Sequence, residues 1–167
     1  MCKMTKYNKY TQYKTVDIKQ RDWPNNSLNK CPIWCSVDLR DGNQALAEPM
    51  DSVRKMKFFK KLIEVGYKEI EVGFPSASDT DFNFIRELIN DGHIPDDVTI
   101  QVLTQSREEL IIKTIESLKG SKNAIIHLYN STSTLQRKVV FKEDMNGVKK
   151  IATDGGKIIS DNIGILN

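Results

Sequence analysis

The sequence has few of the residues that build disulfide frameworks or imidazole metal sites: three cysteines and two histidines among 167 residues. Cys2 lies near the first residue, while Cys31 and Cys35 flank the start of an apolar run. An odd cysteine count without paired C-x-x-C motifs predicts reduced thiols in a cytoplasmic protein, rather than disulfides or structural zinc. Two separate histidines cannot supply a paired histidine motif either.

Long apolar runs are also absent. No stretch approaches the roughly 20 apolar residues that a membrane-spanning helix needs, and none resembles a secretory signal. The chain is 39% hydrophobic and 28% charged, a balance typical of soluble globular domains. We therefore predict no membrane partner.

Positive charge is concentrated at the start of the chain. Residues 1–30 contain seven lysines and arginines but only two acidic residues, whereas the whole chain carries a net charge of +3. Three tyrosines alternate with these lysines, which leaves RNA binding open, but no recognised nucleic-acid motif accompanies them. We interpret residues 1–30 as a solvated basic arm and predict no nucleic-acid partner.

From residue 32 onward, strand-like and helix-like patterns alternate. Four short segments rich in β-branched or aromatic residues predict strands at 33–39, 69–74, 99–103 and 123–129. Apolar residues spaced three or four apart predict helices between them. Predicted helix starts are Asp51, the Ser78–Asp81 capping box and the Ser106–Glu109 capping box, and predicted ends are Gly66, Gly92 and Gly120. A fourth helix with a weaker pattern is predicted from about Glu143 through Ile158, although it contains two residues of low helix propensity, Gly155 and Gly156.

Four strand-helix units predict a parallel sheet, either doubly wound or part of a (β/α)8 barrel. Alternate residues place polar side chains on one face of several strands: Ser36, Asp38 and Arg40; Glu69, Glu71 and Gly73; Ile125 and His127. The opposite faces, with Ile33, Cys35, Val37, Ile70 and Val72, would meet the helices. Since both faces of a doubly wound sheet are apolar, a barrel is favoured. A barrel needs about 250 residues, so residues 31–167 would form half of one.

Several candidate site residues directly follow the first predicted strand. Asp41 is a candidate metal ligand, with Asn43 and Gln44 as further oxygen donors, although Asp-Gly is also an ordinary turn. Arg40 could stabilise an oxyanion or bind a carboxylate. Alternatively, Arg40 forms an ion pair with Asp38 or Glu71.

Two further residues are candidates for the same site. His127 lies at the end of the fourth predicted strand, before a polar loop, and is either a binding residue or a hydrogen-bonded structural histidine. Glu71 is a possible second carboxylate or the counter-ion of Arg40. Residues 73–78 precede a helix and could hold an anion, whereas Cys35 is interpreted as a core residue.

Several of these segments together resemble the 2-isopropylmalate synthase family. The resemblance lies in residues 38–44, 69–82, 105–108 and 127–133, in that order, and extends from about Tyr13 to Asp154. The Arg40-Asp41 pair alone is shared with homocitrate synthase, citramalate synthase and hydroxymethylglutaryl-CoA lyase. The segments 73–82 and 127–133 are more specific.

The resemblance implies a TIM-barrel acyltransferase of leucine biosynthesis that condenses acetyl-CoA with 2-oxoisovalerate and depends on a divalent metal (Mg, Mn or Zn). It implies that Asp41 binds the metal, that Arg40 stabilises the keto oxygen, and that Gln44, Glu71 and His127 contact or line the substrate site. It also implies a homodimer for the full-length enzyme.

The family's other metal ligands, including a His-x-His pair, and its remaining barrel strands lie beyond residue 167. The expectation is therefore an N-terminal fragment of the catalytic barrel that is inactive alone. The alternatives are a non-catalytic remnant that binds a full-length subunit, and part of a homocitrate or citramalate synthase.

Overall fold

The structure, a computed structural model, describes residues 14, 16, 19 and 31–166. The chain divides into two units after Pro32, and all the described helices and strands lie in the second, Ile33–Asn167. The basic arm predicted for residues 1–30 lies almost entirely outside the described residues and stays a prediction. None of the described helices is long and apolar enough to cross a membrane.

The second unit is built on a four-stranded parallel sheet in the order β1-β2-β3-β4. The strands are β1 (Cys35–Ser36), β2 (Glu69–Gly73), β3 (Thr99–Gln105) and β4 (Ala124–Tyr129). The predicted strands at 69–74, 99–103 and 123–129 are confirmed. In the register, Glu71 of β2 lies beside Gln101 of β3, which lies beside Ile125 of β4.

The prediction for the first strand is wrong in its extent. Instead of a strand over 33–39, only Cys35 and Ser36 pair with β2, and Asp38–Gly42 forms a π-helical turn. The N–H groups of Arg40, Asp41 and Gly42 all point to the carbonyl of Val37, at 3.2, 2.8 and 3.2 Å. Because this turn replaces the strand, the predicted shared face of Ser36, Asp38 and Arg40 does not exist.

The residues before this turn also differ from the prediction. Ile33 and Val37 were expected to meet the helices, but they are 71% and 41% exposed. Among the described residues β1 pairs with β2 alone, so this edge of the sheet has no neighbour to bury those side chains.

Four longer helices follow the strands: α1 (Ser52–Val65), α2 (Asp79–Asn90), α3 (Glu108–Leu118) and α5 (Met145–Asn162). Asp51 and Ser78 cap α1 and α2 as predicted, each accepting a backbone N–H three residues later. Gly66 ends α1 with φ 109°, a left-handed conformation that favours glycine. Shorter helical segments occupy Thr134–Gln136 (α4), Arg137–Phe141 and Ile163–Leu166.

The capping box predicted for α3 is wrong. The residue before the helix is Arg107, and no side chain caps it. The Ser106 hydroxyl instead donates a hydrogen bond to the carbonyl of Ile151 in α5, at 2.6 Å. A tertiary partner has replaced the local one.

The fourth predicted helix is confirmed, and α5 continues through Gly155 and Gly156 to Asn162. A Cβ added to Gly155 would lie 2.1 Å from the Ser106 Oγ and 3.3 Å from Leu128. The glycine at 155 therefore allows α5 to approach β4 and the start of α3 closely.

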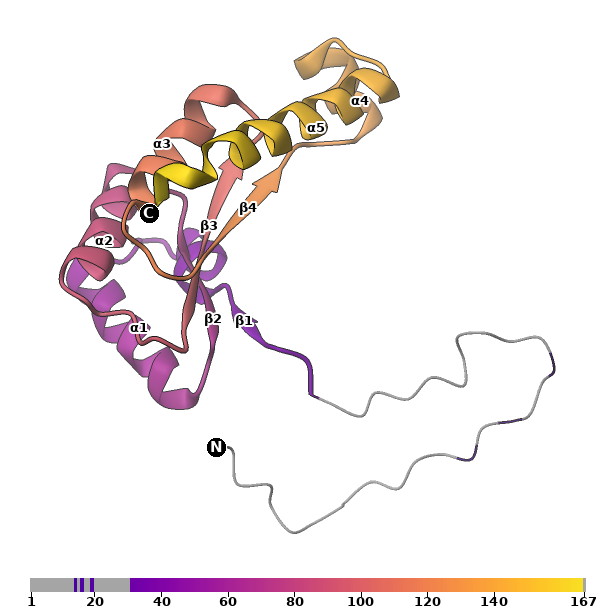
Figure 1. The fold of residues 1–167 in the computed structure, drawn as a ribbon. Helices are drawn as coiled ribbons and strands as arrows, with labels where there is room; N and C mark the ends of the chain where they lie inside the picture. Colours follow the sequence, from indigo (N-terminus) through magenta and orange to yellow (C-terminus); the bar gives the residue numbers. More distant parts are fainter. Residues whose placement is uncertain (1–13, 15, 17–18, 20–30, 167) are drawn as a thin grey trace. The chain divides into compact units, whose positions relative to one another are not determined.

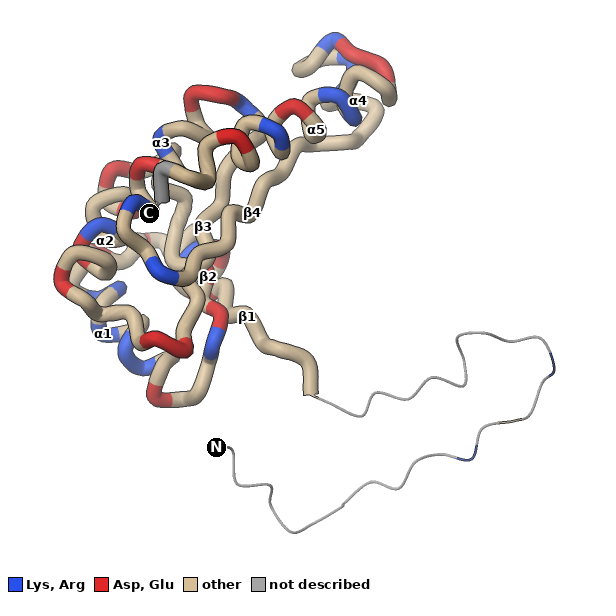
Figure 2. Tube along the Cα trace, viewed as in Figure 1, with Lys and Arg blue, Asp and Glu red and all other residues tan. Residues whose placement is uncertain are grey.

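All four longer helices cover the same face of the sheet (Figure 1). Strand residues on that face, such as Ile70, Val72, Ile100 and Val102, are fully buried against Phe59, Phe84, Ile85 and Leu88 of α1 and α2. Charged residues of both signs are spread along these helices, while β3 and β4 contain none (Figure 2). One-sided covering distinguishes this α/β fold from a doubly wound sheet and agrees with the first units of a barrel.

Candidate functional site

The face of the sheet opposite the helices carries polar side chains. Because strand residues alternate between faces, Glu71 and Gln101 point away from the core residues Ile70, Val72 and Ile100. Leu103 lies beside His127 in the register, and Gln105 lies beside Tyr129. Side chains from three strands therefore meet on one face, and those of Leu103, Gln105, His127 and Tyr129 lie toward the carboxyl ends, where parallel barrels place their sites.

Glu71 is the centre of this cluster, and its side chain is 0% exposed. Its two carboxylate oxygens receive hydrogen bonds from Arg40 Nε and Gln101 Nε2, and Oε2 lies 2.8 Å from His127 Nδ1. A carboxylate accepts hydrogen bonds, so Nδ1 of His127 carries a proton in this contact, and Nε2 has no part in it. His127 is thus hydrogen-bonded, as one of its two predicted alternatives stated, and its partner Glu71 is 56 residues away in the sequence.

These contacts control the charge of Glu71. Burial alone would raise the pKa of the Glu71 carboxyl, but hydrogen bonds from His127, Gln101 and Arg40, together with the charge of Arg40, hold that pKa below its usual value. Glu71 is therefore a carboxylate at neutral pH. A buried anion of this kind fixes the position of the groups that bind it.

Arg40 is held between two carboxylates. Its Nε donates to Glu71 and its Nη1 donates to Asp41 Oδ1 at 2.8 Å, while its side chain is only 15% exposed. The predicted ion pair with Glu71 is present; the one with Asp38 is not among the described contacts. Among the described residues no group accepts a hydrogen bond from Nη2.

A cleft of about 360 Å³ opens above this cluster. Its lining residues come from the turn after β1 and the ends of β2, β3 and β4: Arg40, Gln44, Phe74, Leu103, His127 and Tyr129. Three predicted site residues, Arg40, Gln44 and His127, line it together. Glu71 lies beneath Arg40 and His127, and Asp41 is outside the lining, with 65% of its side chain exposed.

Gln101, Leu103 and Tyr129 were not among the predicted candidates, and Phe74 was included only as part of the segment 73–78. The alternation of the third strand could have indicated Gln101 and Leu103, since they share parity, but that requires the register between strands. The rings of Phe74 and Tyr129 meet edge to face, with centroids 6.3 Å apart.

The donor set for a metal is incomplete within the described part of the chain. No group of three or more His, Cys, Asp or Glu side chains is arranged there to hold an ion. Asp41 offers one exposed carboxylate, already paired with Arg40. Cys35 is partly buried, and desolvation, followed by the charges of Glu71 and Glu69, raises the pKa of its thiol, which disfavours the thiolate.

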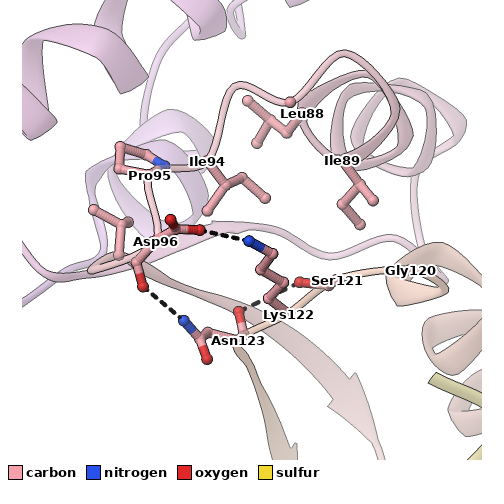
Figure 3. A pocket seen from close by; sticks show the side chains of 11 residues that line it. Leu88, Ile89, Ile94, Pro95, Asp96, Gly120, Ser121, Lys122 and Asn123 are labelled. Carbon is pink, nitrogen blue, oxygen red and sulfur yellow. Dashed lines mark hydrogen bonds and ion pairs between the residues drawn. The ribbon is translucent and has the colours of Figure 1, made fainter. Parts of the chain in front are cut away.

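A second cavity of about 280 Å³ lies at the other end of the strands (Figure 3). It is lined by Leu88, Ile89 and Ile94, among others, and by Asp96 and Lys122, which form an exposed ion pair of 2.7 Å. Asn123 donates to the Asp96 carbonyl beside it. It contains no histidine or cysteine, and it adjoins the amino ends of β3 and β4, away from Arg40 and Glu71.

Comparison with known proteins places this arrangement among its relatives. Residues 31–163 match the family model described as HMGL-like. The chain is 59% identical to the 2-isopropylmalate synthase of Pseudomonas putida (strain GB-1) over 150 residues, which is 90% of this chain and 27% of that protein. It is also 59% identical to the 2-isopropylmalate synthases of Clostridium acetobutylicum and Pseudarthrobacter chlorophenolicus, over 92% and 91% of this chain. In each case the match spans 27% of the relative's length.

Proposed function

The chain belongs to the HMGL-like family, and we propose that it supplies four of the eight strand-helix units of a 2-isopropylmalate synthase. In this proposal the assembled enzyme condenses acetyl-CoA with 2-oxoisovalerate and releases CoA. The observation that carries the proposal is the Arg40–Glu71–His127 cluster, which lies under a cleft at the carboxyl ends of the strands in a chain 59% identical to such synthases.

Arg40 is assigned to the keto oxygen of 2-oxoisovalerate. Once a general base has taken a proton from the acetyl methyl group, that carbon attacks the keto carbon. Negative charge then develops on the keto oxygen, and a fixed cation stabilises it. Glu71 and Asp41 hold the guanidinium on two sides, so little reorganisation is needed during the reaction. We assign Nη2, which has no described acceptor, as the donor to this oxygen.

Glu71 is assigned a positioning role. It is fully buried beneath Arg40 and His127, so it acts through them and does not touch the substrate. His127 donates through Nδ1 to Glu71, which directs Nε2 to the keto acid. Gln44 supplies a further polar contact in the cleft.

The apolar part of the cleft supports a branched aliphatic substrate. Phe74, Leu103 and Tyr129 line the cleft beside the polar residues. The isopropyl group of 2-oxoisovalerate would pack on these side chains, while its keto group faces Arg40. A dicarboxylic keto acid would bring a second charge to this apolar wall, which disfavours it.

The family resemblance implies a divalent metal, and Asp41 is the proposed contributor from this chain. The described residues do not complete a metal site, because no other acidic, histidine or cysteine side chain joins Asp41 in a three-ligand group. When bound at Asp41, the metal would polarise the keto group of the substrate. A cytoplasmic location and a homodimeric full-length enzyme belong to the same proposal; the first rests on the cysteine content of the sequence and the second on the family resemblance.

The test is to assemble the enzyme from two parts. The chain is co-expressed with the portion of the Pseudomonas putida synthase that it does not match, and CoA release is followed with acetyl-CoA, 2-oxoisovalerate and Mg²⁺. We expect turnover from the assembly, little from either part alone, and a loss of at least about a hundredfold with Arg40→Gln, as for removal of one oxyanion donor.

Other results would replace this proposal. A soluble, assembled complex without turnover would indicate a non-catalytic subunit-binding remnant. Faster turnover with pyruvate or 2-oxoglutarate would indicate a citramalate or homocitrate synthase.

A further inference from the structure

A buried ion pair lies directly behind the cleft and has no part in the reaction as described. Lys55 of α1 is 0% exposed, and its ammonium pairs with Asp81 of α2 and donates to the carbonyl of Val72 at 3.2 Å. The same ammonium lies 5.2 Å from the centre of the Phe84 ring. An ammonium is costly to bury unless it is paired and hydrogen-bonded, and Lys55 satisfies both conditions.

Asp81 connects this pair to the end of β2. Its Oδ2 accepts the backbone N–H of Phe74 at 2.8 Å, while its Oδ1 pairs with Lys55. Gly73 lies so close that an added Cβ would be 2.8 Å from Asp81 Cγ. Lys55 and Asp81 therefore hold three consecutive residues, Val72 to Phe74, at the point where the strand leaves the sheet.

Phe74 carries this constraint into the cleft. Its side chain lines the cleft, and its ring meets Tyr129 edge to face. We propose that Lys55 and Asp81 are positioning residues that set the Phe74 wall of the cleft, and thereby the binding of the aliphatic group of the keto acid. The substrate part of this inference rests on the proposed function, whereas the placement of Phe74 does not.

A second ion pair of α2, the helix that contains Asp81, provides a control. Lys113 of α3 pairs with Asp79 of α2 at 3.1 Å and lies 5.9 Å from the Phe82 ring. That pair is exposed and has no described bond to the strand. Lys113→Met therefore removes a similar pair without touching Phe74.

The first test compares two double variants by amide hydrogen exchange and NMR. Lys55→Met with Asp81→Asn, and Lys55→Met with Asp81→Leu, both remove the ion pair, but only asparagine keeps an oxygen that can accept the Phe74 N–H. We expect Phe74 amide exchange about tenfold faster with leucine than with asparagine, the factor that a net hydrogen bond of roughly 1.4 kcal/mol is worth. We also expect the Phe74–Tyr129 ring contact to weaken with leucine alone.

The second test measures substrate binding in the two-part enzyme. The leucine variant should raise the KM for 2-oxoisovalerate several-fold, with a smaller change in kcat and an unchanged KM for acetyl-CoA. In the Lys113→Met control, the KM for 2-oxoisovalerate should stay at the wild-type value. Equal KM values in the asparagine and leucine variants would overturn the substrate part. If the two-part enzyme has no turnover, the affinities of the asparagine and leucine variants for 2-oxoisovalerate are compared instead, by NMR titration of the chain.

The placement of Phe74 can be contradicted without any variant. In the unmodified chain, a through-hydrogen-bond NMR correlation should connect the Phe74 amide proton with Asp81 Cγ. Its absence, or rapid exchange of the Phe74 amide, overturns the inference even where the double variants fail to fold.

Discussion

Arg40 and Glu71 are 31 residues apart in the sequence, and in the fold the guanidinium Nε of one donates to the buried carboxylate of the other. This bond joins the turn after β1 to the middle of β2. Gln101 and His127 bring β3 and β4 to the same carboxylate. One buried anion thus connects all four strand-helix units of the site.

The first prediction concerns the stability that this carboxylate provides. Glu71→Gln leaves Arg40 without its buried anion, so we expect a loss of about 3 kcal/mol in the free energy of unfolding, measured with urea. Glu64→Gln is the matched control because Glu64 pairs with Lys61 on the surface of α1, both side chains being 63% exposed. That control should change the stability by less than about 1 kcal/mol. Equal losses in the two variants would contradict the central role of Glu71.

The second prediction concerns pH. The folded-state pKa of Glu71 lies below its ordinary value of 4.5, so its contribution is fully present above pH 4.5. It is lost as the pH falls through the folded-state pKa, because the unfolded chain then binds the proton more readily. Urea unfolding between pH 7 and pH 3 should show this loss, and the loss should be smaller in Glu71→Gln. Parallel pH profiles for the two proteins would refute the assignment.

The third prediction uses two adjacent glycines of α5. Gly155→Ala places a methyl group against the Ser106 hydroxyl and Leu128, so we expect a loss of about 1 to 3 kcal/mol from overpacking. A Cβ added to Gly156 would meet no other part of the described structure within 4 Å, and Gly156→Ala should gain about 0.5 to 1 kcal/mol from helix propensity. Thermal unfolding of both variants checks the opposite signs. A gain in both would show that α5 does not pack closely on Ser106.

The fourth prediction concerns the two histidines. In the two-part enzyme, His127→Asn should lower kcat/KM for 2-oxoisovalerate about tenfold, because a hydrogen bond to the substrate is lost. His93→Asn, in the turn after α2, should leave the rate unchanged. Steady-state assays of CoA release measure both. An unchanged rate with His127→Asn would remove His127 from the proposed site.

Much of the regular structure was predictable because its signals are local. The strands at 69–74, 99–103 and 123–129 follow from short apolar runs, and the starts of α1 and α2 follow from Asp51 and Ser78. The first strand failed because Asp38–Gly42 closes a helical turn on a single carbonyl, which an apolar, alternating pattern does not reveal. The cap predicted at Ser106 is absent because the Ser106 hydroxyl donates a hydrogen bond to the carbonyl of Ile151 instead.

The candidate site was predictable in part for the same reason. Arg40 and Gln44 follow β1 and His127 lies in the second half of β4, near the edge where parallel sheets collect polar residues, and these three residues line one cleft. The contributions of Gln101 and Phe74 depend on the register of β2 with β3 and on the contact of Asp81 with the Phe74 amide. Neither this register nor this contact can be obtained from the spacing of residues along the chain.

The amino-acid sequence by itself determined the alternation of strands and helices, the parallel sheet and the family resemblance, since these depend on side-chain patterns over a few neighbouring positions. Only the tertiary structure decided that Glu71 is buried with three partners, that Lys55 is paired behind the cleft, and that Gly155 is a contact point. The physical reason is that burial and pairing depend on residues distant in the sequence, up to 56 positions for Glu71 and His127. Burial and pairing therefore contribute to stability only after the strands have assembled into the sheet.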